Sequence, residues 1–241
     1  MTVRIAGARV LVTGAGRGLG AEFSRELLQR GAATVYGGAR DPASVTIPGV
    51  TPVQLDITSS DQVAAAAKRC ADVSILINNA GIMHSSPQLA APDMKAARAE
   101  METNYFGTLS MCRAFAPVLG ANGGGALVNI LSVTAWFANP LNSSYGASKS
   151  AAWSLTNAAR IELYRQGTLV TGVFAGFIDT EMAALIDMPK ISPASVVQQT
   201  LDGIEAGAVE VLTSDRVRSI KARLPHDQTE IYPDLVAIWE G

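Results

Sequence analysis

A glycine-rich segment near the start of the chain separates an apolar run from a helical pattern. Residues 9–13 (RVLVT) form the run, residues 14–20 (GAGRGLG) supply the glycines, and apolar positions recur at helical spacing over residues 21–30. A strand, a tight glycine turn and a helix in this order are typical of a dinucleotide-binding unit, because glycines let backbone amides approach a pyrophosphate at the helix N-terminus. Two alternatives stay open on this segment alone: a turn without a ligand, and the cofactor turn of a methyltransferase.

Strand and helix patterns alternate along the whole chain. Further apolar runs predict strands at residues 34–36, 51–55, 73–77, 126–131, 169–174 and 209–213. Helical spacing predicts helices at residues 63–70, 104–119, 144–165 and 193–206. This alternation indicates an α/β fold in which a doubly wound parallel β-sheet carries helices on both faces, the Rossmann arrangement. With 241 residues and no repeat or linker, the chain is predicted to form a single domain over residues 1–241.

Composition excludes several other classes of protein. A formal net charge of −2 leaves no basic excess to neutralise a phosphate backbone, so no nucleic-acid partner is expected. Cys70 and Cys112 lack CxxC spacing, which argues against a disulfide framework or a zinc site, and no metal is expected. No apolar run reaches the ~20 residues that span a bilayer, and residues 1–7 are too short and polar for a signal peptide. We therefore expect a cytoplasmic protein with no membrane partner.

The end of the second predicted strand indicates which dinucleotide is bound. A carboxylate there would bind the adenosine ribose and repel a 2′-phosphate. Here Ala39 occupies the approximate place of that acid, Arg40 follows it, and Arg17 lies in the glycine turn. Two guanidinium groups favour a phosphate dianion, so the sequence predicts NADP(H), with NAD(H) as the less favoured cofactor. Asp41 leaves an alternative open, because it could serve the ribose if the register shifts by two residues.

Polar side chains follow several of the predicted strands. Residues 78–81 (NNAG) close the fourth strand, Asn104 is predicted to open a helix, and Ser132 ends the fifth strand. Tyr145 and Lys149 stand at positions i and i+4 of one helix and therefore share a face. Each has an ordinary structural reading by itself, as a surface pair, a turn partner or a helix cap.

Taken together, these features resemble the short-chain dehydrogenase/reductase family. The glycine turn TGAGRGLG, the NNAG segment, Asn104, and Ser132 thirteen residues before the motif YGASK match that family in order and spacing, over roughly residues 9–182. The resemblance implies an enzyme that moves a hydride between nicotinamide and a carbonyl or alcohol carbon. One departure is Ala175, which stands where the family has a proline.

The resemblance also implies the roles of individual residues. Tyr145 is expected to be the general acid and base, and Lys149 to favour its phenolate and to hold the nicotinamide ribose. Ser132 is expected to stabilise the substrate oxygen, and Asn104 to anchor a water that relays protons from Lys149. The implied cofactor contacts are Gly14, Gly16, Arg17, Gly18, Leu19, Gly20, Arg40, Asp56, Ile57, Asn78, Ala80, Gly81, Tyr145, Lys149, Ile178 and Thr180.

Two other functions compete with the enzyme. A non-catalytic NADP(H) sensor of the same fold would bind the cofactor but normally lacks the Tyr/Lys pair. A sugar-nucleotide epimerase or dehydratase would need a larger carboxyl-terminal substrate domain than the residues after Thr180 can form.

The substrate side is less constrained by sequence. Residues 178–192 are interpreted as a substrate lid, with an ordinary connection as the alternative, and residues 214–241 as a C-terminal extension. The residues expected to border the substrate are mostly apolar, which favours an apolar carbonyl or alcohol. They are Val133, Thr134, Ala135, Trp136, Phe137, Ile82, Met83, His84, Phe177, Met182 and Leu185, although Trp136 and Phe137 could instead belong to the core. Residues 104–119 and 145–165 carry small and apolar residues on several faces, more than one sheet can cover. The family resemblance implies that these helices pair across a two-fold axis in a homodimer or homotetramer.

Overall fold

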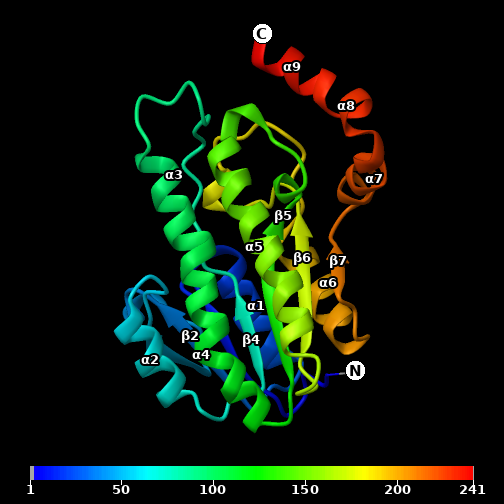
Figure 1. Cartoon of the computed structure of the whole chain (residues 1–241). Coiled ribbons are helices and arrows are strands. Elements are labelled where there is room, and N and C mark those ends of the chain that lie inside the picture. Colours follow the sequence, from blue (N-terminus) through cyan, green and yellow to red (C-terminus); the bar gives the residue numbers. More distant parts are fainter. Residues whose placement is uncertain (1–2, 241) are drawn as a thin grey trace.

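The computed structural model describes residues 3–240, and a seven-stranded sheet lies at its centre. The strands lie in the order β3-β2-β1-β4-β5-β6-β7, and each neighbouring pair is parallel. Their bounds are β1 Arg9–Thr13, β2 Thr34–Ala39, β3 Val50–Gln54, β4 Ile75–Asn78, β5 Ala126–Ser132, β6 Leu169–Ala175 and β7 Glu210–Leu212. All carboxyl ends therefore meet at one edge of the sheet, which is the upper edge in Figure 1.

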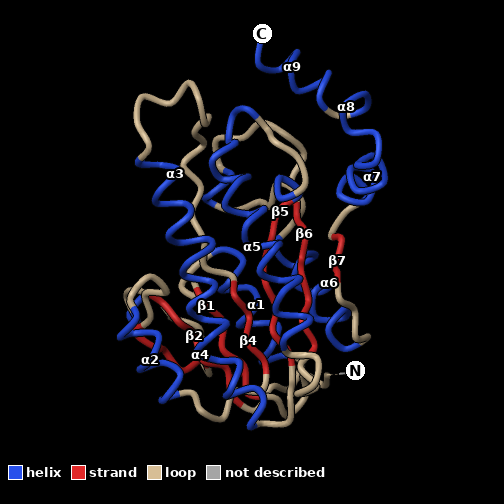
Figure 2. Tube along the Cα trace, in the orientation of Figure 1, coloured by secondary structure: helices blue, strands red, loops and turns tan. Residues whose placement is uncertain are grey.

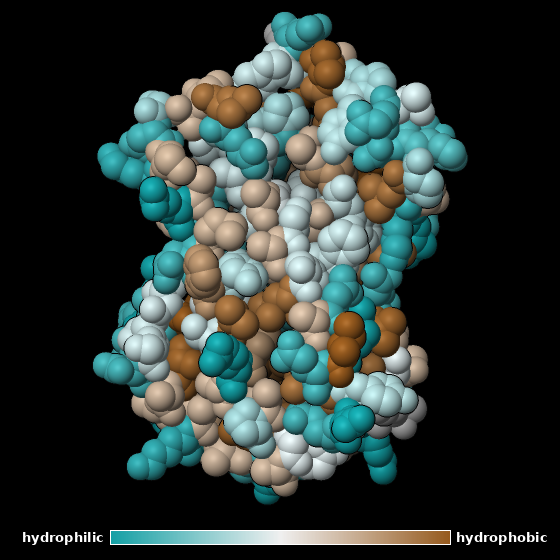
Figure 3. Space-filling model, viewed as in Figure 1, coloured by the Kyte–Doolittle hydropathy of each residue, from teal (hydrophilic) through white to brown (hydrophobic). Residues whose placement is uncertain are grey.

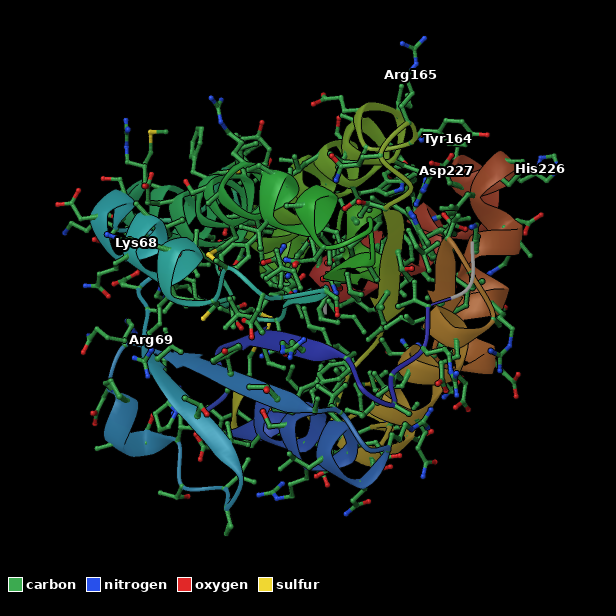
Figure 4. All side chains as sticks on the ribbon, turned by 90° about the horizontal axis from the view of Figure 1, so that it is seen from below. Lys68, Arg69, Tyr164, Arg165, His226 and Asp227 are labelled. Atoms are coloured by element: carbon green, nitrogen blue, oxygen red, sulfur yellow. The ribbon has the colours of Figure 1, made fainter. Side chains whose placement is uncertain are left out.

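Helices cover both faces of this sheet. They are α1 Gly18–Gln29, α2 Ser60–Arg69, α3 Lys95–Glu100, α4 Thr108–Ala121, α5 Ser143–Glu162, α6 Pro193–Glu205, α7 Asp215–Arg223, α8 Asp227–Glu230 and α9 Tyr232–Glu240. Helix α4 packs against α2 and α5, whereas α1 packs against α6. Seen from below, the two groups lie on opposite sides of the strands (Figure 4). The predicted doubly wound α/β fold is confirmed.

Burial explains why the short apolar runs became strands. Val10, Leu11 and Val12 of β1 are all fully buried, and they alternate between the two faces of the sheet. Val10 and Val12 belong to the same core cluster as Phe23 of α1, and Leu11 belongs to the cluster that holds Phe115 of α4. Each such side chain contributes about 1.5–3 kcal/mol on burial, which outweighs the weak local preferences of a five-residue run.

Strand β2 is longer than the sequence predicts. The apolar run ends at Tyr36, but the strand continues through Gly37 and Gly38 to Ala39. A Cβ atom on Gly37 would lie 2.8 Å from Val45 and Val50 side-chain atoms, and one on Gly38 would lie 2.7 Å from Leu55. The two glycines thus let neighbouring side chains pack directly on the strand backbone, and parallel pairing with β3 offsets their low strand propensity.

The prediction that Asn104 opens a helix is wrong. Helix α3 begins at Lys95 and leads without a break through a π-helical segment, Met101–Gly107, into α4, so Asn104 lies inside a long helical run. The segment from Lys95 to Glu100 (KAARAE) consists of strong helix formers, and their propensity outweighs the preference of asparagine for a helix start. The wider π turn is a local departure of the kind that often occurs at functional sites.

Loops and the C-terminal helices gather above the carboxyl ends of the strands (Figure 2). Residues 178–192 form an irregular segment with one 3₁₀ turn, Glu181–Ala183, and an isolated bridge joins Ile178 to Ile191. Helix α7 and the residue Ile231 pack on Phe174 and Val133 in a third core cluster. Helix α9 exposes Val236, Ile238 and Trp239, and Figure 3 shows hydrophobic side chains at this end of the molecule.

No helix among residues 3–240 combines the length and the apolar character needed to cross a membrane.

Candidate active site

The glycine turn lies where the strand order reverses between β1 and β4. Neighbouring crossovers leave the sheet in opposite directions there, which opens a crevice at the carboxyl edge. Gly14 and Gly18 have φ angles of 68° and 52°, which side-chain-bearing residues rarely adopt. A Cβ atom on Gly20 would overlap the Gly14 carbonyl oxygen, so α1 approaches the turn more closely than any other residue would allow.

The N-terminus of α1 carries no side-chain cap. Arg17 occupies the capping position, but its side chain makes no hydrogen bond to the first turn of α1. The guanidinium instead pairs with Glu181 of the 178–192 segment, with 2.8 Å between Nη1 and Oε2, and both side chains are exposed. The first backbone N–H groups of α1 are therefore left available for an anion.

The NNAG segment after β4 is tied to the glycine turn. The Asn79 side-chain amide donates to the backbone carbonyl oxygens of Thr13 (2.9 Å) and Gly14 (3.3 Å). The Thr13 hydroxyl in turn accepts from the backbone N–H groups of Asn79 and Ala80, both at 3.0 Å. Asn78 points the other way, because its side-chain amide donates to Asn129 Oδ1 (2.9 Å) inside the sheet. Any contact of Asn78 with a cofactor would have to use its backbone.

Arg40 and Asp56 come together at the ends of β2 and β3. The pKa of Asp56 is lowered, chiefly because its carboxylate accepts the Thr58 backbone N–H, and Arg40 is close enough to add to this effect. Ile57 packs against Gly107 at the end of the π-helical segment, where a Cβ atom on the glycine would lie 2.8 Å from the isoleucine side chain. Asp41 Oδ1 accepts from Ala43 N at 3.0 Å and so caps the following turn.

Tyr145 lies in the first turn of α5, partly exposed beside Ser132. Removal of the phenol from water raises its pKa above the usual value, and hydrogen bonding with Ser132 acts in the opposite direction. The Lys149 amine is 5.7 Å from the centre of the Tyr145 ring. The predicted Ser132, Tyr145 and Lys149 are therefore neighbours at the carboxyl end of β5.

Lys149 is almost completely buried, with 6% of its surface exposed. Its Nζ atom donates to the Ile130 carbonyl oxygen at 2.9 Å, and burial lowers the pKa of the amine to about 8. A Cβ atom on Gly81 would lie 3.7 Å from this Nζ and 3.0 Å from Asn104 Oδ1. The amine, the NNAG segment and Asn104 therefore meet at one point.

Asn104 is buried, and its side-chain amide forms hydrogen bonds with both the backbone N–H and the backbone carbonyl of Ile82. Oδ1 accepts from Ile82 N and Nδ2 donates to Ile82 O, both at 2.9 Å, while Nδ2 also donates to Ser148 Oγ at 2.9 Å. This arrangement holds the segment after β4 against α5. Because the side-chain amide already forms these hydrogen bonds, a water at Asn104 would have to bind the backbone of that residue.

The arrangement matches a known family. The family model described as short chain dehydrogenase matches residues 8–190. The chain belongs to the short-chain dehydrogenase family.

Relatives of this short-chain dehydrogenase act on different alcohols. This chain is 34% identical over 190 residues to the galactitol 2-dehydrogenase (L-tagatose-forming) of Cereibacter sphaeroides, and the alignment covers 74% of each chain. It is 31% identical over 185 residues to the cis-4-hydroxycyclohexanecarboxylate dehydrogenase of Sinomonas cyclohexanicum, covering 72% of this chain and 74% of the relative.

Solved structures extend this similarity. A short chain dehydrogenase from Burkholderia cenocepacia in complex with NADP superposes with a TM-score of 0.92 and 45% identity, covering 96% of this chain and 98% of that one. A gluconate 5-dehydrogenase from the same organism, in complex with NADP and tartrate, gives a TM-score of 0.78 and 25% identity over 86% of this chain and 94% of that one.

Thr134 has a role in this short-chain dehydrogenase that the sequence does not reveal. Its backbone N–H and its hydroxyl both point at Ser132 Oγ, at 3.2 and 2.9 Å. When both donate, the Ser132 oxygen accepts two hydrogen bonds, so its own proton is directed outward. A separation of two residues does not predict this contact from sequence, because the 3₁₀ turn Val133–Ala135 creates it.

Substitution of Thr134 by valine is expected to lower kcat about fivefold. The change removes one hydrogen bond to Ser132, worth about 1 kcal/mol, and leaves the serine proton free to turn inward. Steady-state kinetics would measure the effect, with Thr134→Ser as the matched control that keeps the hydroxyl. An unchanged kcat in the valine variant would contradict the orienting role of Thr134.

The residues expected around the substrate do not all reach the crevice. Trp136 stacks on Phe174 with 4.2 Å between ring centres and belongs to the core environment instead. Thr134 to Ala138 line an open cleft of about 430 Å³, which Gly146 and Ser150 of α5 and Tyr232 of α9 also border. Met182 and Leu185 lie exposed on the 178–192 segment.

Proposed function

We propose that this short-chain dehydrogenase is an NADP(H)-dependent oxidoreductase that interconverts a ketone or aldehyde and the corresponding alcohol, with Tyr145 as general acid and base. The observation that carries the proposal is the cluster of Ser132, Tyr145 and Lys149 next to Gly81. Gly81 follows Ala80, which contacts the glycine turn at Gly14. The reacting groups and the anion-binding turn thus border one crevice.

The residues of the glycine turn fit a dinucleotide. The backbone at Gly14 and Gly18 and the uncapped start of α1 form a cradle in which side chains would fill the space of a pyrophosphate. Thr180 reaches the opposite side of this cradle, since its methyl group lies 3.5 Å from a Cβ position on Gly18. Ile178 precedes it on the bridge to Ile191. When bound, the nicotinamide supplies or accepts the hydride.

The protein residues handle the proton. In reduction, the Tyr145 hydroxyl donates its proton to the carbonyl oxygen, and the Ser132 hydroxyl donates a hydrogen bond to the developing alkoxide. The Lys149 ammonium stabilises the phenolate that remains, and Asn104 is the proposed anchor of the water through which the proton is replaced. In oxidation the same groups act in reverse.

NADP(H) is the proposed cofactor. Arg40 is exposed at the end of β2, and Asp41, the alternative ribose ligand, already caps the next turn. Arg17 is held only by an exposed ion pair with Glu181, worth at most about 1 kcal/mol, so a phosphate dianion can compete for it. The NADP complexes of two structural relatives favour the same choice.

Replacement of Arg40 by aspartate is expected to reverse the cofactor preference. Loss of a charged phosphate contact costs about 2–3 kcal/mol and the new carboxylate repels the 2′-phosphate, so kcat/KM for NADPH should fall at least 30-fold relative to NADH. The measurement is the ratio of kcat/KM for the two cofactors, with exposed Arg69 on α2, replaced by aspartate, as the control (Figure 4). A ratio unchanged from the native enzyme would remove Arg40 from this role.

The experiment that tests the function is NADPH oxidation with a panel of carbonyl compounds. Turnover above background with any of them supports the enzyme, and cofactor binding without turnover across the panel favours a non-catalytic NADP(H) sensor. The exposed apolar side chains of Met182 and Leu185 support an apolar substrate. Acetophenone and cyclohexanone therefore represent the proposed class, and galactitol with NADP⁺ represents the polyol class of one relative.

The proposal extends to the organisation of the chain. Residues 1–241 would form one domain, with residues 178–192 as the substrate lid and residues 214–241 as a C-terminal extension that packs on the sheet through α7. A cytoplasmic location stays a prediction from composition.

The outer faces of the helical layer support a homodimer or homotetramer. Three large side chains are exposed there: Ile161 on α5, Tyr164 just after α5, and Phe106 on the π-helical segment. Figure 4 shows Tyr164 directed outward beyond the end of α5. Large apolar side chains on neighbouring helices commonly form the buried core of a two-fold subunit interface. Sedimentation velocity at micromolar concentration tests the association.

A further inference from the structure

Glu100 is a carboxylate buried beside the candidate active site. It ends α3, four residues before Asn104, and none of its surface is exposed. Among residues 3–240 it is the only carboxylate in the buried class, and no lysine, arginine or histidine side chain forms an ion pair with it. Burial of a carboxylate without a neighbouring cation costs several kcal/mol in lost hydration. Its hydrogen bonds therefore have to compensate for this loss.

Both oxygens of Glu100 bind segments that border the crevice. Oε1 accepts from the His84 backbone N–H at 2.6 Å, and Oε2 accepts from the Ser144 hydroxyl at 2.5 Å. His84 follows the NNAG segment, and Ser144 precedes Tyr145 in the first turn of α5. The carboxylate therefore clips the segment after β4 to the turn that carries the proposed proton donor.

The charge of Glu100 also reaches Tyr145. After burial of the ring, the carboxylate is a further cause of the raised pKa of the phenol. The other charged and titratable groups on α3, the π-helical segment, the segment after β4 and the first two turns of α5 are the exposed Lys95, Arg98, Glu102 and His84, the half-buried Tyr105 and the buried Lys149. Water screens the four exposed groups, so Lys149 and Glu100 are the two buried charges that act on Tyr145 in opposite directions.

We propose that Glu100 is a positioning residue that clips α5 to the segment after β4 and whose charge keeps Tyr145 in its proton-donating phenol form. The proposal rests on the proposed function and adds to it a role for the charge beside Tyr145. In reduction the O–H bond of Tyr145 breaks as the substrate oxygen takes the proton, while the reduced nicotinamide is oxidised as it gives the hydride to the carbonyl carbon. A group that must start as a phenol benefits from a neighbouring negative charge. The charge therefore opposes that of Lys149 and keeps the proton donor available for carbonyl reduction up to higher pH.

The test is a spectroscopic titration of Tyr145 that needs no substrate. Phenolate absorbance is recorded against pH, and the Tyr145→Phe variant in the same background is subtracted to isolate one tyrosine. Two neutral variants are compared: Glu100→Gln, whose amide can accept from the His84 N–H and donate to Ser144 Oγ, and Glu100→Met, which can do neither. Methionine is uncharged and close to glutamate in length, so it provides a second neutral variant if the glutamine variant does not fold.

Both neutral variants are expected to lower the midpoint of Tyr145 ionisation by about one pH unit. The control Glu102→Gln, an exposed carboxylate two residues along the chain, should leave it unchanged. With cyclohexanone and NADPH at pH 7, kcat should fall about tenfold in Glu100→Met and much less in Glu100→Gln, because only methionine breaks the clip. A purely structural role would lower both activities without moving the midpoint.

An unshifted midpoint in a folded neutral variant overturns the proposal. So does an unchanged kcat in Glu100→Met, because the clip would then position nothing. The proposed function fails separately: native protein that turns over no carbonyl compound refutes the enzyme, while the shift of the Tyr145 midpoint can still be measured without turnover.

Discussion

Replacement of Tyr145 by phenylalanine is expected to lower kcat by about 10³-fold or more while the Kd for NADPH stays within threefold. The substitution removes one oxygen atom and leaves the ring, so the crevice keeps its shape. Without that oxygen, the proton for the substrate must come from water, and general acid catalysis of this kind contributes about 10²–10⁴-fold. Loss of turnover with cofactor binding retained is the pattern of an interaction made in the transition state.

The matched control is Tyr36→Phe. Tyr36 lies on β2, which β1 and β4 separate from β5 and Ser132, and its hydroxyl bonds to Asp72 at 3.1 Å. Loss of this hydroxyl should leave kcat within twofold. Steady-state kinetics and NADPH fluorescence titration measure both variants. Residual activity above one tenth of native in Tyr145→Phe would assign the proton to another group.

Replacement of Lys149 by methionine is expected to abolish most activity and at the same time to raise stability near pH 7. Activity should fall at least 10²-fold, because the phenolate would lose Lys149, the one buried lysine or arginine among residues 3–240. Stability should rise because burial lowers the pKa of the amine to about 8, which means that the folded protein holds the ammonium less well than the unfolded chain does.

The pH dependence follows from that shift. Below pH 8 both states are protonated, and the folded state carries the full cost of the buried charge. Between about 8 and the ordinary lysine pKa of ~10.4, the folded state loses its proton first, so native stability rises with pH and the cost disappears. The bond from Nζ to the Ile130 carbonyl offsets part of the cost, which leaves a net gain for methionine of about 1 kcal/mol, or about 2–4 °C in Tm.

Thermal unfolding at pH 7 and pH 10 measures this effect. The gain of Lys149→Met over the native protein should be present at pH 7 and much smaller at pH 10. Exposed Lys68 on α2 (Figure 4), replaced by methionine, is the control and should change Tm by less than about 1 °C at either pH. A variant less stable than the native protein at pH 7 would show that the amine is held by interactions stronger than its cost of burial.

Much of this fold can be predicted from the sequence, because the patterns that indicate strands and helices are local. Alternating apolar runs and helical spacing predict the order of strands and helices from Arg9 to Leu212, and the glycine turn predicts the crevice beside it. The boundaries fail where a local preference conflicts with packing. Gly37 and Gly38 extend β2 because their lack of side chains admits Val45, Val50 and Leu55, and the helix formers before Asn104 outweigh its tendency to cap.

The sequence by itself determined the residue types that the site needs: a glycine turn, a tyrosine and a lysine one helical turn apart, and a serine at the end of a strand. Those follow from spacing along one chain segment. Only the tertiary structure decided what holds them, namely Thr134 on Ser132, Asn104 on the Ile82 peptide, and Glu100 between His84 and Ser144. Partners of buried polar groups come from segments distant in sequence, and only packing determines which acceptor lies within 3 Å of which donor.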